Sequence, residues 1–124
     1  MALELKTVQT HKAAGRYIEG GSGTPLVFLH GAGGATIADP FLTKLAAKYH
    51  LYAPLLPGYG DSDECASIRD MLDFTLHTWA VVEALGLKNP FLTGHSMGGM
   101  IAAELAASAP NYVTRLRLIG AGGL

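Results

Sequence analysis

The sequence predicts an α/β fold in which an N-terminal β-hairpin is followed by a mostly parallel sheet with helices on both faces. Residues near the N-terminus alternate between apolar and polar, which is typical of strands with one solvated face. Further along, short apolar runs alternate with longer helical patterns, as in sheets whose strands are joined by crossover helices. The 16 glycines cluster between these segments without a repeat, which indicates tight turns. We therefore expect residues 1–124 to form a single domain.

The first part of the chain is predicted to form three strands. Residues 3–10 and the stretch around Arg16–Glu19 form the two arms of the hairpin, separated by Ala13–Gly15. Pro25–His30 is a continuous apolar run of the kind found in central parallel strands. The glycine-rich loop Gly31–Gly34 follows directly, so it is expected at the end of a buried strand.

The rest of the chain alternates between helix and strand. A long amphipathic helix is expected from about Ser67 to Leu85, with Gly86 well placed to end it. A second helix, Met97–Ser108, carries a single charge at Glu104, so most of its surface must be covered. The other expected elements are a helix from about Pro40 to Tyr49 and strands at His50–Pro54, Pro90–His95 and Val113–Ile119.

Charge and composition narrow the classes of partner. The formal net charge is −1 and the charges are interspersed, which gives no reason to expect a nucleic acid or a membrane surface as a partner. No apolar run is long enough to span a bilayer, and the N-terminal residues carry charges where a signal peptide needs an apolar stretch. A cytoplasmic location is therefore expected. Cys65 is the single cysteine, so no intrachain disulfide is possible, and no His, Cys, Asp or Glu grouping has metal-ligand spacing.

A serine lies where the third apolar strand gives way to the apolar helix. Gly94, Ser96 and Gly98 have the spacing G-x-S-x-G, with His95 and Met97 between them. A sharp strand-to-helix turn holds such a serine in a strained conformation with its hydroxyl exposed above the sheet. Side chains two residues away on either side would collide there, which explains the two glycines. Ser96 is therefore the candidate nucleophile.

Two further segments follow strand ends. His30, Gly31, Ala32, Gly33 and Gly34 come directly after the first central strand. The segment Ala53–Ser62 (APLLPGYGDS) comes after the next one.

Together the three motifs resemble the N-terminal half of the α/β-hydrolase fold family. The resemblance implies an oxyanion hole made by the backbone amides of Ala32 and Met97, with His30, Gly31, Gly94, His95 and Gly98 supporting the loop and the turn. Each such donor contributes about 3 kcal/mol to transition-state binding. In the segment after the next strand, Leu55 replaces an acid that is usual in the family. The expected reaction is hydrolysis of an ester or related acyl bond in a small molecule, and it needs no cofactor.

The same residues allow other interpretations. The glycine loop could bind a dinucleotide. However, Thr36 stands where the dinucleotide-binding motif has its last glycine, and the following strand does not end in the acid that would bind a ribose. His30 and His95 are expected to be structural, one fixing the loop and the other packing behind the turn. Asp73 and His77 are spaced i, i+4 and could be a base and its orienter, but a solvated surface pair is expected instead.

The sequence contains no acid–histidine pair after the serine. Glu104 is the one acid that follows Ser96, and no histidine follows it. The family order is serine, acid, histidine, so both are expected from outside this chain or are missing. The outer edge of Val113–Ile119 is expected to be open, which favours a homo-oligomer or a complementing second chain. The alternative function is a non-catalytic fragment that acts as an interaction or binding module.

Overall fold

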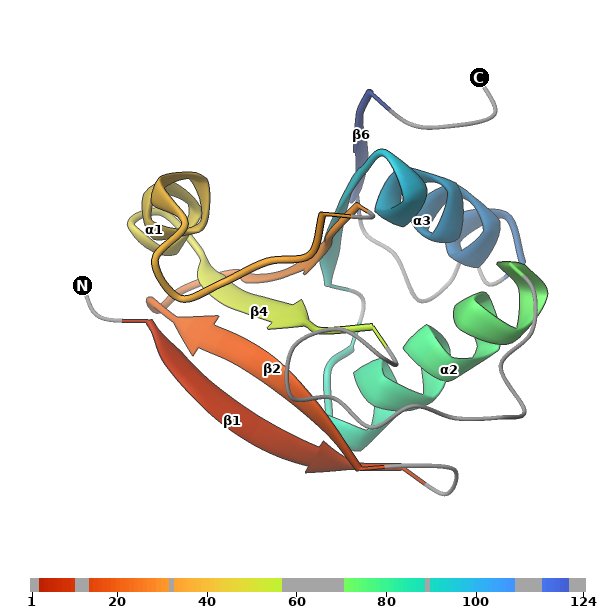
Figure 1. Ribbon diagram of the computed structural model, residues 1–124, viewed down its shortest axis with the longest axis horizontal. Coiled ribbons are helices and arrows are strands. Elements are labelled where there is room, and N and C mark those ends of the chain that lie inside the picture. The colour runs from red at the N-terminus through yellow and green to blue at the C-terminus, as the bar shows by residue number, and fades with distance from the viewer. Residues whose placement is uncertain are drawn as a thin grey trace.

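The computed structural model describes residues 3–10, 14–31, 33–56, 71–88, 90–108 and 115–120. Within these residues six strands form one sheet in the order β1-β2-β4-β3-β5-β6 (Figure 1). The β1–β2 and β2–β4 pairs are antiparallel, and the β4–β3, β3–β5 and β5–β6 pairs are parallel. The elements are β1 (Glu4–Gln9), β2 (Ala14–Gly20), β3 (Pro25–Leu29), α1 (Pro40–Ala46), β4 (His50–Pro54), α2 (Met71–Ala84), β5 (Phe91–His95), α3 (Met97–Ser108) and β6 (Arg115–Ile119).

Helices cover both faces of the sheet, as predicted. Successive residues of a strand point to opposite faces. On β3, Leu26 and Phe28 belong to the apolar cluster that contains Leu42 of α1. Val27 and Leu29 belong to a second cluster, which contains Val82 and Ala102 together with other residues of α2 and α3. Figure 1 accordingly shows α1 apart from α2 and α3, which lie together.

The chain reverses its direction across the sheet at β3. From β3 it first moves to β4 on one side, and then returns past β3 to β5 on the other side. Right-handed crossovers place the helices before and after such a reversal on opposite faces. A crevice forms at the carboxyl ends of the two strands that flank a reversal of this kind, and ligands of open α/β sheets bind there. In this chain those ends are Leu29 of β3 and Gly94 of β5, which pair in register.

Two element boundaries in the structure differ from the prediction. Ala14 and Gly15 were expected in the hairpin turn, but they belong to β2 and pair with Gln9 and Val8 of β1. Backbone pairing continues there because the small residues do not interrupt an antiparallel ladder. Helix α1 ends at Ala46 instead of near Tyr49. The Leu45 carbonyl accepts from the amides of both residues 48 and 49, which tightens the last turn before β4 begins.

The ends of α1 and α2 carry recognisable caps. The Asp39 carboxylate accepts from the Phe41 amide at 2.9 Å, with proline at the first helical position. Gly86 ends α2 with a φ of +73°. Its amide bonds to the Glu83 carbonyl at 2.9 Å and the Leu87 amide to the Val82 carbonyl at 3.3 Å, the Schellman pattern. The expected helix start at residues 67–70 and the strand residues 113–114 lie outside the described part of the chain.

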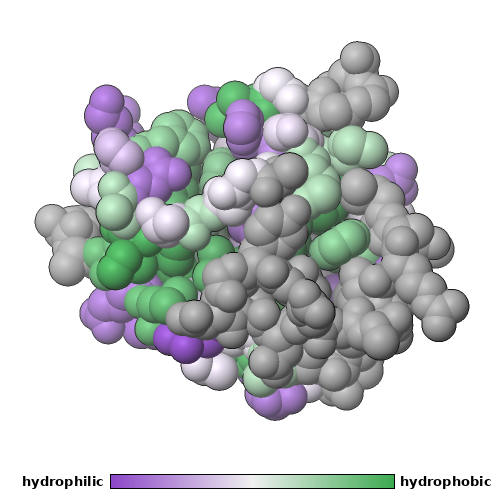
Figure 2. Space-filling model, in the orientation of Figure 1, coloured by the Kyte–Doolittle hydropathy of each residue, from purple (hydrophilic) through white to green (hydrophobic). Residues whose placement is uncertain are grey.

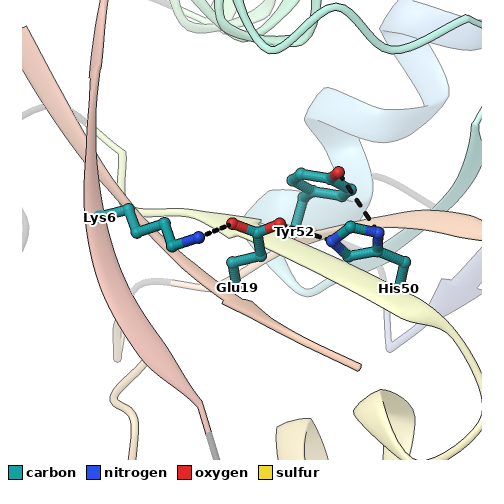
Figure 3. Close-up of polar contacts among 4 residues, drawn as sticks. All are labelled: Lys6, Glu19, His50 and Tyr52. Carbon is teal, nitrogen blue, oxygen red and sulfur yellow. Dashed lines mark hydrogen bonds and ion pairs between the residues drawn. The ribbon is translucent and has the colours of Figure 1, made fainter. Parts of the chain in front are cut away.

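A polar network joins β1, β2 and β4 away from the reversal (Figure 3). The Glu19 carboxylate lies 2.7 Å from Lys6 Nζ and 2.5 Å from His50 Nε2, and His50 stacks on Tyr52 with ring centroids 4.4 Å apart. Burial raises the pKa of Glu19, but the hydrogen bonds and charges of Lys6 and His50 outweigh burial and lower it below its usual value. The network therefore favours an ionised Glu19 at neutral pH.

The described surface on one face of the molecule is mixed in polarity. On the face seen in Figure 2, hydrophilic and hydrophobic residues are interspersed. None of the helices in the described ranges has the length and apolar character needed to cross a bilayer. In the same ranges β6 stands at one end of the sheet order, and Leu116 and Ile119 are exposed by 38% and 37%.

Candidate active site

Ser96 occupies the turn between β5 and α3. Its φ of +55° is the single positive value among the non-glycine residues that the structure describes. An L-residue is strained there, by about 1–3 kcal/mol, and persists when its surroundings hold it. The Ser96 amide donates to the Ile119 carbonyl of β6 at 3.1 Å, and the Ser96 carbonyl accepts from Gly99 and Met100 at 3.0 and 3.3 Å. The strained turn is thus fixed on one side by the sheet and on the other by the helix.

The two glycines that flank the serine are required by backbone contacts. A methyl group added at Gly98 would lie 2.0 Å from the Leu29 carbonyl oxygen and 2.6 Å from that of His30. One added at Gly94 would lie 2.3 Å from the Gly98 carbonyl oxygen. These neighbours are backbone atoms, which cannot rotate away as side chains do. The first turn of α3 therefore lies directly against the ends of β3 and β5, which is the collision expected from the sequence.

The glycine loop after β3 lies beside the serine. A methyl group added at Gly31 would lie 3.0 Å from Ser96 Cβ and 3.2 Å from the His95 carbonyl oxygen. The Gly34 amide closes the loop on the Gly31 carbonyl at 3.0 Å. Ala32, an expected oxyanion donor, lies outside the described residues. Met97, the other expected donor, is the first residue of α3, where backbone amides have no acceptor within the helix.

His30 is buried and holds two loops together. Its Nε2 accepts from the Leu56 amide at 3.0 Å, and its Nδ1 lies 2.6 Å from the Gly31 carbonyl oxygen. Because Nε2 is an acceptor, the ring is neutral with its proton on Nδ1. Burial lowers the pKa of His30 and outweighs the opposing hydrogen bond to Gly31. His30 therefore ties the end of β3 to the segment after β4 and is not available as a base for Ser96.

His95 does not pack behind the turn as expected. Its side chain is exposed and lines a cavity together with Ser96. The reason is strand alternation: Gly94 faces α3, so the residue after it points to the opposite face of the sheet. A role of His95 inside the packed turn is excluded by this geometry.

The cavity beside Ser96 has a volume of about 540 Å³, within the range of small-molecule sites. Its walls come from the ends of β3, β5 and β6, the glycine loop and the start of α1. The lining residues are Phe28, His30, Gly31, Gly33, Gly34, Asp39, Phe41, His95, Ser96 and Ile119. The sequence did not predict Phe28, Asp39, Phe41 or Ile119 as site residues, because their proximity to Ser96 depends on the strand order.

The other candidates do not join this site. His77 was expected in a solvated pair with Asp73, but it is buried, and it lines a different cavity with Gln9 and Thr10. It is buried because its helix packs near β1. Leu55 is buried in the apolar cluster on the α1 face, and its amide donates to the Arg16 carbonyl at 2.9 Å. Residues 57–62 of the third motif and Cys65 lie outside the described ranges, in which no three His, Cys, Asp or Glu residues gather to hold a metal.

Known proteins resemble this chain in sequence, and solved structures resemble it in fold. A dihydrolipoyllysine-residue acetyltransferase component of an acetoin cleaving system from Pseudomonas putida is 37% identical over 106 residues, covering 85% of this chain and 29% of that protein. A pimeloyl-(acyl-carrier protein) methyl ester esterase from Pectobacterium carotovorum is 35% identical over 101 residues, covering 79% of this chain and 37% of that protein. The crystal structure of a bacterial membrane phospholipase A matches with a TM-score of 0.88 and 34% identity, covering 99% of this chain and 41% of that one.

This chain therefore spans 29% to 41% of the length of these three proteins. The model of the α/β-hydrolase fold family matches residues 24–122, which include β3, the glycine loop, the serine turn and β6. With its sheet order and its strained serine at the chain reversal, this chain belongs to the α/β-hydrolase fold family and corresponds to the N-terminal part of that fold.

Proposed function

We propose that Ser96 is the nucleophile of a serine hydrolase that cleaves an ester or a related acyl bond. The observation that carries this proposal is the strained φ of +55° at Ser96 beside a cavity of about 540 Å³. Backbone strain at a non-glycine residue is retained where function requires it. The name of the methyl ester esterase that resembles this chain supports the same class of reaction.

The proposed mechanism is acyl transfer through the serine. The Ser96 hydroxyl oxygen attacks the substrate carbonyl carbon while its proton passes to a base, and the backbone amides of Ala32 and Met97 stabilise the oxyanion. The alcohol leaves with a proton from that base, and water then hydrolyses the acyl–serine bond. The proton that leaves Ser96 goes to the alcohol and a proton of the attacking water restores the serine hydroxyl, so the cycle consumes one water and no cofactor.

The base and its acid partner are proposed to come from outside this chain. Both ring nitrogens of His30 are engaged, and no histidine follows Ser96 in the sequence. Among the described residues β6 has no strand on its outer side, and its exposed apolar side chains Leu116 and Ile119 favour pairing with a further strand from a second polypeptide or a second copy. Light scattering at micromolar concentration tests this assembly, and a monodisperse monomer would contradict it.

Hydrolysis of a small activated ester tests the nucleophile. We expect Ser96→Ala to lower the rate to the weak catalysis that the oxyanion donors alone can supply, whereas equal rates for the two proteins would remove Ser96 from the mechanism. Ser96→Gly is the control for folding, because glycine adopts the positive φ without strain. It is expected to be inactive but about 1 kcal/mol more stable than the wild type.

A fluorophosphonate probe tests whether a base is present. A serine with a base reacts quickly with such a probe, whereas a serine with oxyanion donors alone retains only weak catalysis, about 10³–10⁴-fold over water. If Ser96 neither reacts nor contributes to ester cleavage, the alternative of a non-catalytic binding module is favoured.

A further inference from the structure

Exposed apolar side chains gather at the mouth of the Ser96 cavity. Five large hydrophobic side chains are exposed in the described part of the chain, and two of them, Phe41 (40%) and Ile119 (37%), line this cavity. A third, Ile37 (52%), lies in the short loop between the cavity residues Gly34 and Asp39. Exposed apolar groups that cluster beside a concave site indicate that an apolar partner covers them.

The aromatic wall of the cavity continues inward from its mouth. The Phe41 ring meets the ring of Phe28 edge to face, with centroids 5.6 Å apart. Phe28 is buried in the α1-face cluster, so it anchors the more exposed ring. An acyl chain whose carbonyl carbon lies at Ser96 would contact Phe41, Phe28 and Ile119 on its way out of the cavity.

Charge in the cavity disfavours an anionic chain. The described lining holds no lysine or arginine, and the Asp39 carboxylate, its one acidic group, caps α1. Two cations, Arg115 and Arg117, line a smaller neighbouring cavity of about 140 Å³ that shares Phe41 and Ile119. The Arg115 guanidinium lies over the Phe91 ring at 5.1 Å from its centroid, so it already has an aromatic partner.

We infer that this cavity binds the neutral, apolar acyl chain of an ester, with Phe41 as the residue that selects for chain length. This inference rests on the proposed role of Ser96. A buried methylene favours binding about fourfold, so a chain of several methylenes along Phe41 and Ile119 gives a clear preference over acetate.

Binding of uncleaved esters to Ser96→Ala tests the inference apart from catalysis. Calorimetric titration is expected to give a dissociation constant at least about tenfold lower for methyl octanoate than for methyl acetate. Phe41→Ala in the same background narrows this ratio about fivefold. Leu76→Ala is the matched control, because Leu76 is equally exposed (45%) but lines a different cavity, and it leaves the ratio unchanged.

Four results would overturn the inference. Equal affinity for the two esters excludes an acyl-chain site, and an equal effect of Phe41→Ala and Leu76→Ala excludes Phe41 as its selector. Tighter binding of monomethyl suberate, which has the same chain length but ends in a carboxylate, would instead assign chain binding to Arg115 and Arg117. If the wild type cleaves esters without any chain-length preference, the proposed role of Ser96 stands and only the acyl-chain site is excluded.

Discussion

Two regions of the described sheet are held together in different ways. At the carboxyl ends of β3 and β5, backbone lies against backbone: the first turn of α3 contacts the Leu29 carbonyl where Gly98 has no side chain. At the β1–β2–β4 end, side chains make the connection, with Glu19 between Lys6 and His50 (Figure 3). Backbone contacts cannot adjust to an added atom, whereas exposed ion pairs are readily replaced by water. The serine site should therefore be far less tolerant of substitution than the hairpin.

Gly98→Ala is expected to have the largest effect. The added methyl group would lie 2.0 Å from the Leu29 carbonyl oxygen, so β3 and α3 must separate at a cost of about 3 kcal/mol or more. Urea unfolding followed by circular dichroism measures the change. Gly33→Ala, in the glycine loop after β3, is the matched control, because a methyl group there meets no atom within 4 Å, and its effect should stay within about 0.5 kcal/mol. If both variants unfold at similar urea concentrations, the close contact at Gly98 does not determine the stability.

Lowering the pH is expected to have an intermediate effect on the free energy of unfolding. The pKa of His30 is lowered in the folded state by burial, so the unfolded chain takes up the proton more readily. Stability that is fully present above about pH 6.5, the ordinary histidine pKa, should fall as the pH drops from there through the lowered folded value. The measurement is the unfolding free energy between pH 7.5 and pH 5. His30→Gln should be less stable at pH 7.5 but have a shallower pH slope, and parallel slopes would argue against His30 as the source.

The smallest effect is expected at the hairpin. Lys6→Ala removes an exposed partner of Glu19, and water can solvate the carboxylate that remains beside His50. The unfolding midpoint should move far less than in Gly98→Ala. High salt should shrink the difference further, because it screens exposed charges. A loss that matches Gly98→Ala and persists in 0.5 M salt would remove the contrast between the two regions.

Local pattern predicted most of the elements. The strand His50–Pro54 and the helix Met97–Ser108 have the expected bounds, because apolar runs, proline and the glycines on either side of Ser96 mark their ends. Gly86 ends α2 as expected, since the left-handed cap favours glycine there. The predicted boundaries were wrong where the extent of an element depended on contacts with a neighbouring element and not on its own residues. Ala14 and Gly15 joined β2 because β1 offered hydrogen-bond partners.

The candidate site was also predicted only in part from the sequence. The spacing around Ser96 and the loop after β3 were visible in the sequence because such turns restrict residue type at fixed positions. The cavity was not visible, since Phe28, Phe41 and Ile119 are distant in the chain and meet through the strand order. His77 is buried and His95 is exposed, contrary to the prediction, because burial depends on which face of an element is covered.

The sequence by itself determined where the chain must bend and which residue stands at the bend. Glycine at 94 and 98 and serine at 96 specify a strand-to-helix turn through the sizes of their own side chains. Tertiary structure alone decided what faces that serine, because the reversal at β3 places β3 beside β5 and brings the loop, α1 and β6 around one cavity. Local sterics act over a few residues, whereas a cavity wall is made of segments joined only by packing.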